Sequence, residues 1–147
     1  MARLRIVLDT NVYISGLLWT GTPHRILQAA ETGEFILVTT PAIVEEVQGA
    51  LVRPKFASRI TALNTSVREL TESLLSIVEV IREPRVKPII AQDPDDDKVL
   101  ACAIASRARW IVSGDSHLLA VKRYGRVSIL TPKQFWDTWT EDHAKRP

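Results

Sequence analysis

The stretch Leu4-Arg5-Ile6-Val7-Leu8-Asp9, near the amino terminus, is an apolar run that ends in a carboxylate. Apart from Arg5 it is continuously apolar, which is typical of a strand buried on both faces in a parallel sheet. In sheets of this kind the ligand site lies beyond the carboxyl ends of the strands. We therefore expect Asp9, which ends the run, at the functional edge of the sheet.

Three further apolar runs, at 35–38, 110–112 and 127–130, are typical of buried strands. The run 76–81 fits either a strand or the end of the preceding helix. Strands that alternate with helices predict a single three-layer α/β domain with a mainly parallel sheet over residues 1–140, followed by a polar tail over 141–147. The expected helices cover 24–32, 64–75 and 97–107, with two more that begin at Thr40-Pro41 and Thr131-Pro132.

The composition is that of one globular domain. The chain has 147 residues, 46% of them hydrophobic and 24% charged, which allows a single continuous core. No apolar run approaches the roughly 18 residues that span a bilayer, and the first residues lack the apolar segment of a signal peptide. Cys102 lies in an apolar run and is expected to be a core residue. We therefore expect a cytoplasmic protein without disulfides or a membrane segment.

The net charge of +2 hides an uneven distribution. Acidic residues are concentrated in residues 93–97, so the rest of the surface is more basic than the total indicates. Basic surface around an acidic pocket would suit a polyanionic substrate, although scattered solvated charge fits the sequence equally well. The basic residues form three clusters, which are Arg53, Lys55 and Arg59; Arg82, Arg85 and Lys87; and Lys122, Arg123 and Arg126.

Carboxylates follow two of the expected strands. Asp9 and Asp115 each fit a helix cap or a turn when taken singly, but together they fit two side chains that point into one crevice. In the helix that begins at Thr40-Pro41, a rotation of ~100° per residue turns Glu45 away from the apolar face and places Glu46 at its edge. Glu46 is therefore the third candidate; a favourable charge near the helix N-terminus is the alternative.

The acidic run before residues 97–107 supplies a fourth candidate. Most of this run fits helix capping and the helix dipole. Asp97 stands on the same side of the helix as Ala101 and Ala105, whose small size permits close approach to the sheet; Asp96 is the alternative. Four converging carboxylates repel one another unless a cation neutralises them, and oxygen ligands of this kind select Mg²⁺ or Mn²⁺.

Four segments together resemble the PIN-domain family, particularly the VapC-like ribonucleases that are toxins of toxin–antitoxin pairs. They are residues 7–12, 40–56, 93–100 and 111–119, in the order of the family. The resemblance implies a PIN-like fold in which four acidic residues bind Mg²⁺ or Mn²⁺ and carry catalysis. Three polar residues would orient the first or last of them. The acidic residues are Asp9, Glu46, Asp97 and Asp115, and the polar ones are Asn11, Ser15 and Ser113.

The resemblance also implies the reaction and the partners. Phosphodiester bonds of single-stranded RNA would be hydrolysed by a metal-activated water, without a protein nucleophile. An antitoxin protein and self-association as a homodimer would follow. His117 could shuttle a proton, but its expected place in a loop favours a surface role. The sequence does not identify RNA-binding residues.

Other functional classes remain open. A catalytically weak PIN module would bind RNA or a protein partner through the segment 67–81 or the pair Trp136 and Trp139, although core packing is the simpler interpretation of the tryptophans. A nuclease of this fold could also act in RNA processing or DNA repair. Phosphoryl transfer through an aspartyl intermediate fits poorly, because Asn11 stands where such enzymes have a second aspartate.

Overall fold

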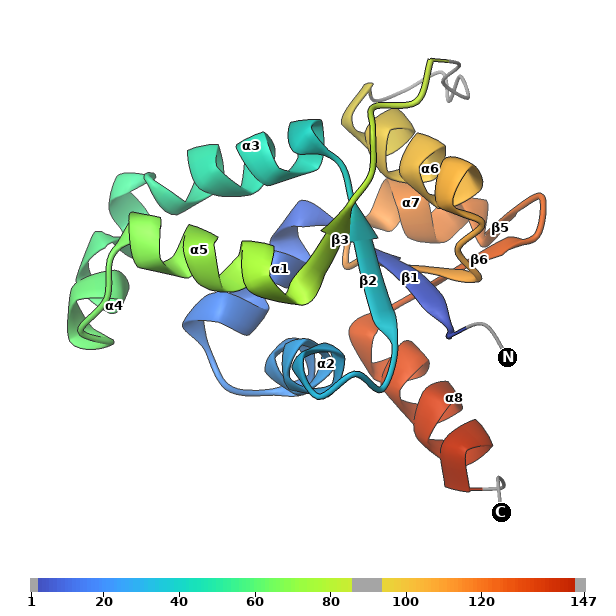
Figure 1. The fold of residues 1–147 in the computed structure, drawn as a ribbon, viewed down its shortest axis with the longest axis horizontal. Coiled ribbons are helices and arrows are strands. Elements are labelled where there is room, and N and C mark those ends of the chain that lie inside the picture. Colours follow the sequence, from blue (N-terminus) through green and yellow to red (C-terminus); the bar gives the residue numbers. More distant parts are fainter. Residues whose placement is uncertain (1–2, 86–93, 145–147) are drawn as a thin grey trace.

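The computed structural model describes residues 3–85 and 94–144. Along this part of the chain one or more helices separate successive strands, except for the last two strands, which follow each other directly (Figure 1). The elements are β1 (Arg5–Leu8), α1 (Thr10–Leu18), α2 (Thr22–Glu31), β2 (Ile36–Thr39), α3 (Pro41–Leu51), the 3₁₀ helix η1 (Pro54–Phe56), α4 (Ala57–Ala62), α5 (Val67–Ile77), β3 (Val78–Val80), α6 (Pro94–Ser106), β4 (Trp110–Val112), α7 (Ser116–Val121), β5 (Arg123–Tyr124), β6 (Val127–Leu130) and α8 (Pro132–Ala144).

Within the described residues, six strands form one sheet in the order β3-β2-β1-β4-β6-β5. All neighbouring strands are parallel except β5 and β6, which form an antiparallel hairpin. In the centre of the sheet, Ile6 of β1 pairs with Leu37 of β2 and with Trp110 of β4. The five parallel strands therefore end at one edge, here called the carboxyl edge, and begin at the opposite amino edge. The predicted α/β domain with a mainly parallel sheet is confirmed.

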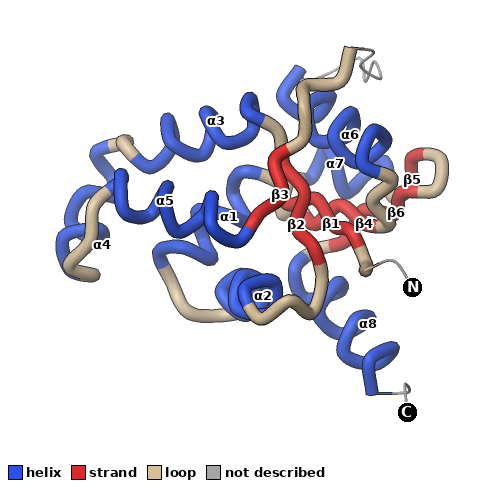
Figure 2. The backbone as a smooth tube through the Cα atoms, viewed as in Figure 1, coloured by secondary structure: helices blue, strands red, loops and turns tan. Residues whose placement is uncertain are grey.

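Helices cover both faces of the sheet. Helix α6 packs against β1, β2 and β4, whereas α8 packs against β4, β6 and α2. Figure 2 shows α6 and α7 above the strands and α2 and α8 below them. Between sheet and α8, the ring of Phe35 meets those of Phe135 and Trp139 edge-on at centroid distances of 5.5 and 5.3 Å. Trp139 and Trp136 both pack against the core, as the simpler interpretation expected.

Several local predictions are confirmed. The Thr40 hydroxyl caps α3 by accepting a hydrogen bond from the Ile43 amide at 3.3 Å. The ambiguous run 76–81 is divided, since α5 ends at Ile77 and β3 follows directly. Cys102 is fully buried with its Sγ 3.7 Å from the Val38 carbonyl oxygen. Burial raises the pKa of this thiol to about 12, so it is a core residue and not a nucleophile.

Five elements that the sequence did not predict are α1, η1, α4, α7 and β5. Helix α1 buries side chains around most of its circumference, including Val12, Tyr13 and Leu18, so it lacks the polar face that reveals a surface helix. The loop expected around His117 is wrong, because this residue lies in the first turn of α7. Helix α8 continues to Ala144, past the start of the predicted tail. No helix in the described ranges has the length and apolar character needed to cross a bilayer.

Candidate metal-binding site

The candidate site lies at the carboxyl edge, around the end of β1. Asp9 directly follows β1, and Asp115 follows β4, the strand next to it. Helix α3 follows β2 on the other side of β1 and carries Glu46 on its second turn. Because the three strands are parallel neighbours, the segments that follow them start from the same edge. The topology therefore brings together three of the four acidic positions.

A buried hydroxyl links Asp9 to Asp115. Ser113 is fully buried, and its Oγ donates a hydrogen bond to Asp9 Oδ2 at 2.8 Å. The same Oγ accepts a hydrogen bond from the Asp115 backbone amide at 2.9 Å. One serine thus holds the first carboxylate and fixes the backbone that carries the last one. Its sequence position, between β4 and Asp115, makes this possible.

A second hydroxyl links Asp9 to Glu46. The backbone amide of Thr10 donates to Asp9 Oδ1 at 2.8 Å, and the Thr10 hydroxyl donates to Glu46 Oε1 at 2.9 Å. On the other side of the same carboxylate, Lys98 Nζ lies 3.5 Å from Glu46 Oε2. Glu45 is exposed, so the prediction that Glu46 is the inward-facing residue of this pair is confirmed.

The electrostatic environment of Asp9 is unfavourable for a charged carboxylate. Burial raises the pKa of Asp9 above 3.8, and the hydrogen bonds from Ser113 and Thr10 oppose this rise. The nearby negative charges of Glu46 and Asp115 raise this pKa further. Repulsion between the three carboxylates is the condition that a bound cation relieves.

Asp97 lies in the first turns of α6 and is partly buried. This helix packs against α3 and β1, and the contact between Lys98 and Glu46 places its beginning beside α3. The side chain of Asp96 lies outside the described residues, so the choice between Asp96 and Asp97 stays a prediction. The role of Asp97 as the fourth ligand is likewise a prediction.

The donor set fits a hard divalent cation in its chemistry. It consists of carboxylate oxygens, with serine and threonine hydroxyls between them and no sulfur. Within residues 3–85 and 94–144, no three His, Cys, Asp or Glu side chains are gathered closely enough to form a ready metal site. The carboxylates are instead joined through hydroxyl groups, so these residues would hold a metal only with further approach of their side chains.

The side chain that holds Asp9 differs from those expected. Ser113 lies beside Asp115, as expected, and also bonds to Asp9, whereas Asn11 and Ser15, which were expected to orient Asp9, are exposed. In the described residues the remaining hydrogen bond to the Asp9 carboxylate comes from Thr10. Sequence reasoning missed Thr10 and Lys98. Their positions directly after Asp9 and Asp97 were the available signal, but each contact depends on how α3 packs against α1 and α6.

Both strand-end aspartates also cap helices. Asp9 is the N-cap of α1 and Asp115 that of α7, where its Oδ1 accepts from the amides of His117 and Leu118 at 2.7 and 3.3 Å. The ring Nδ1 of His117 lies 3.7 Å from the same oxygen, and this side chain is 63% exposed. The capping interpretation of both aspartates is therefore confirmed, and it leaves room for a second role.

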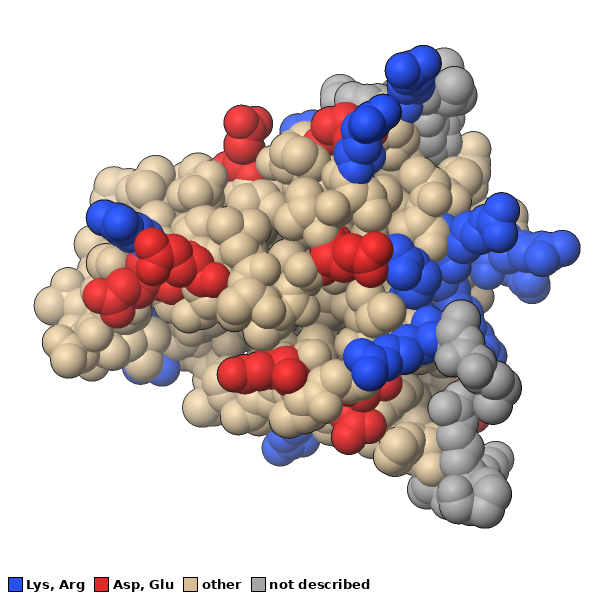
Figure 3. Space-filling view, viewed as in Figure 1, with Lys and Arg blue, Asp and Glu red and all other residues tan. Residues whose placement is uncertain are grey.

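The basic clusters do not surround the acidic residues evenly. Arg82 and Arg85 follow β3 at the carboxyl edge, whereas Arg126 precedes β6 at the amino edge. In Figure 3 the Lys and Arg side chains gather most densely on the right, over the β5–β6 hairpin and the amino edge. Arg59 has a structural role, since its Nε donates to the Leu18 carbonyl at 2.7 Å. Lys87 lies outside the described residues.

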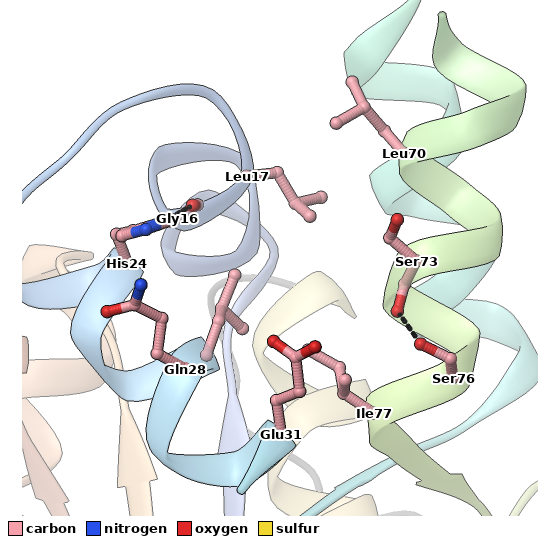
Figure 4. Close-up of a pocket in the computed structure, with 10 residues that line it drawn as sticks. Gly16, Leu17, His24, Gln28, Glu31, Leu70, Ser73, Ser76 and Ile77 are labelled. Atoms are coloured by element: carbon pink, nitrogen blue, oxygen red, sulfur yellow. Dashed lines mark hydrogen bonds between the residues drawn. The ribbon is translucent and has the colours of Figure 1, made fainter. Parts of the chain in front are cut away.

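A hollow of about 260 Å³ lies between α1, α2 and α5 (Figure 4). It is lined by apolar groups such as Leu17 and Leu70 and by polar ones such as His24, Glu31 and Ser73. His24 Nδ1 is engaged with the Gly16 carbonyl oxygen at 3.0 Å. None of the four candidate acidic residues lines this hollow in the described part of the chain, so it is separate from the site.

In a parallel α/β sheet the ligand site lies beyond the carboxyl ends of the strands, and this chain gathers carboxylates at that edge. A PIN-domain family model matches residues 5–117. The chain therefore belongs to the PIN-domain family, whose members are generally nucleases.

Two further proteins are similar to this chain. An uncharacterized protein of Methanocaldococcus jannaschii, MJ1680, is 30% identical over an alignment of 142 residues, which covers 90% of this chain and 90% of the other. The fold is similar to a chain in the crystal structure of VapBC2 from Rickettsia felis bound to a DNA fragment from their promoter. That match has a TM-score of 0.59 at 14% identity and covers 86% of this chain and 97% of the other.

Proposed function

We propose that this protein is a metal-dependent endoribonuclease that hydrolyses single-stranded RNA, and that it is the toxin of a toxin–antitoxin pair. The observation that carries the proposal is the linked set of carboxylates at the carboxyl edge. Asp9 is bonded to Ser113, and Thr10 connects it to Glu46. Membership of the PIN-domain family supports nuclease chemistry at this place.

In this proposal the acidic residues would hold the metal ion, and neighbouring hydroxyl groups orient the carboxylates. Asp9, Glu46, Asp97 and Asp115 would hold Mg²⁺ or Mn²⁺, which when bound would activate the attacking water and offset charge on the phosphate. Ser113 fixes the direction of the Asp9 carboxylate by its 2.8 Å hydrogen bond, and Thr10 does the same for Glu46 at 2.9 Å. Asn11 and Ser15 are exposed on α1, where they would contact RNA or solvent.

A nuclease that is a toxin would also have protein partners. The similar Rickettsia felis structure is of a VapBC2 complex bound to promoter DNA. By this likeness in fold, we infer an antitoxin partner for this protein, self-association as a homodimer and a cytoplasmic location. A nuclease for RNA processing or DNA repair would use the same site with other partners.

A catalytically weak binding module is the second candidate. The observation in its favour is that Asp9 and Asp115 already have structural roles as helix caps. If capping were their whole purpose, replacing them by asparagine, an equally good cap, would change nothing. The nuclease proposal expects the opposite, because asparagine is a poor ligand for Mg²⁺.

The test is cleavage of labelled single-stranded RNA, duplex RNA and single-stranded DNA by purified protein in Mg²⁺, Mn²⁺ or chelator. We expect cutting of single-stranded RNA that needs the metal and disappears in Asp9→Asn. Asp137→Asn, on the exposed surface of α8, is the matched control and should cut normally. Absence of cutting in every metal, by folded protein free of bound partners, would favour the binding module.

A further inference from the structure

Glu46 already has a cation beside it. Lys98 Nζ lies 3.5 Å from Oε2, while the Thr10 hydroxyl donates to Oε1 at 2.9 Å. Both oxygens of the carboxylate are therefore engaged, by donors from two different helices. The two charged side chains are 30% and 29% exposed, so the ion pair is partly shielded from water and less screened than a surface pair.

Lys98 reaches Glu46 from α6, from the residue directly after the candidate ligand Asp97. A lysine ammonium group is a compact point charge on a flexible stem, and it can neutralise a carboxylate much as a metal ion does. Here it lies beside Glu46, the carboxylate that Thr10 links to Asp9. The lysine thus belongs to the acidic site in space, although it is not an acidic ligand.

We propose that the Lys98 ammonium group is a built-in counter-cation for Glu46, and that it takes the place of a second divalent ion in this site. The inference rests on the proposed function. The four candidate carboxylates carry four negative charges, of which one divalent ion and one ammonium group offset three. A second divalent ion at Glu46 would lie beside the ammonium group and be repelled by it.

Two consequences follow for the chain's own residues. Lys98 positions Glu46, because it and Thr10 hold opposite oxygens of one carboxylate. Lys98 also limits the number of divalent ions, since its ammonium group would repel a second ion that approached Glu46. Metal-dependent nucleases can use one or two metals, and this inference places the chain in the one-metal class.

The direct test counts metal ions. Titration of the metal-free protein with Mn²⁺, followed by electron paramagnetic resonance and calorimetry, should give one ion per chain in the wild type. Lys98→Met should admit a second ion, or bind Mn²⁺ roughly tenfold more tightly, because the competing charge is gone. Lys98→Arg keeps the charge and should remain at one ion.

Two more variants sharpen the count. The double variant Lys98→Met with Glu46→Gln should not bind the second ion that Lys98→Met admits, because the carboxylate beside that ion is lost. Lys133→Met removes an exposed lysine 3.1 Å from Asp137 on α8 and should leave the count unchanged. Thermal melting establishes that each variant is folded.

Two results would overturn the inference. Either two ions in the wild type, or the same count and affinity in Lys98→Met as in the wild type, would show that Lys98 does not act as a counter-cation. A different result marks failure of the proposed function itself. If the wild type binds no Mn²⁺, or if Asp9→Asn binds Mn²⁺ as well as the wild type does, the acidic residues are not a metal site and both proposals fail.

Discussion

The carboxyl edge of the sheet joins like charges through hydroxyl groups, whereas the amino edge joins arginines to groups that attract them. At the amino edge, Arg5 donates to the Ser106 carbonyl at 2.9 Å and to Glu79 at 3.1 Å. Arg109 lies over the ring of Trp110 at 4.4 Å. At the carboxyl edge, Asp9 is partly buried close to Glu46 and Asp115, and its pKa is raised.

The difference separates contacts that stabilise the fold from contacts that hold a site together. The arginine contacts lower the free energy of the folded state by ordinary attraction. Gathering carboxylates raises it, and the hydrogen bonds from Ser113 and Thr10 offset only part of that rise. Local arrangements that oppose stability are expected at functional sites. The carboxyl edge is therefore where ligand binding should have its largest effect on stability.

The largest effect is expected from Asp115→Asn. Asparagine caps α7 as well as aspartate does, so the free energy of unfolding should change little. RNA cleavage should fall at least about 100-fold, since a metal ligand is lost. Cleavage rates and melting temperatures, measured side by side, separate the two roles of Asp115. Unchanged cleavage in a folded variant would leave capping as its whole role.

Ser113→Ala should affect both properties. The buried hydroxyl bonds to Asp9 and to the Asp115 amide, so its loss should lower the free energy of unfolding by about 1–3 kcal/mol. Cleavage should fall roughly 10–100-fold, because the Asp9 carboxylate is no longer oriented. The pKa of Asp9 should rise further, since Ser113 holds it down. Full activity in Ser113→Ala would argue against an orienting role.

Arg5→Met should give the smallest effect of the three variants. It should lower stability and leave cleavage unchanged, which is the opposite of Asp115→Asn. Its two hydrogen bonds at the amino edge stabilise the fold, and their loss should lower the free energy of unfolding by about 1–2 kcal/mol. Cleavage by the folded variant should be unchanged. Denaturant titration and the RNA assay at a temperature well below melting make the comparison. A selective loss of cleavage would show that the amino edge takes part in function.

The positions of the acidic residues could be predicted from the sequence because they depend on local rules. Asp9 and Asp115 follow apolar runs that are typical of buried strands, and helix geometry alone distinguishes Glu46 from Glu45. Each of these predictions depends only on the side-chain periodicity within one strand or one helix.

The contacts between the acidic residues could not be predicted, because they depend on packing between elements. Thr10 reaches Glu46 only since α1 packs against α3, and Lys98 does so since α6 packs beside α3. Helix α1 itself was missed because it is buried on most sides. His117 was expected in a loop but lies in α7, whose first turn is capped by the side chain of Asp115.

In the proposed function, the carboxyl edge lowers the stability of the folded protein until a cation binds there. Since burial raises the folded-state pKa of Asp9 above 3.8, its ionised carboxylate opposes folding at pH 7 in the absence of metal, and that penalty grows as the pH rises through the raised pKa. Thermal unfolding of wild type and Asp9→Asn at pH 7, with and without Mn²⁺, is the most direct measurement. Without metal, the variant should melt about 2 °C or more above the wild type, and Mn²⁺ should raise the melting temperature of the wild type alone. A variant that melts lower than the wild type, with equal Mn²⁺ shifts in both, would contradict the claim.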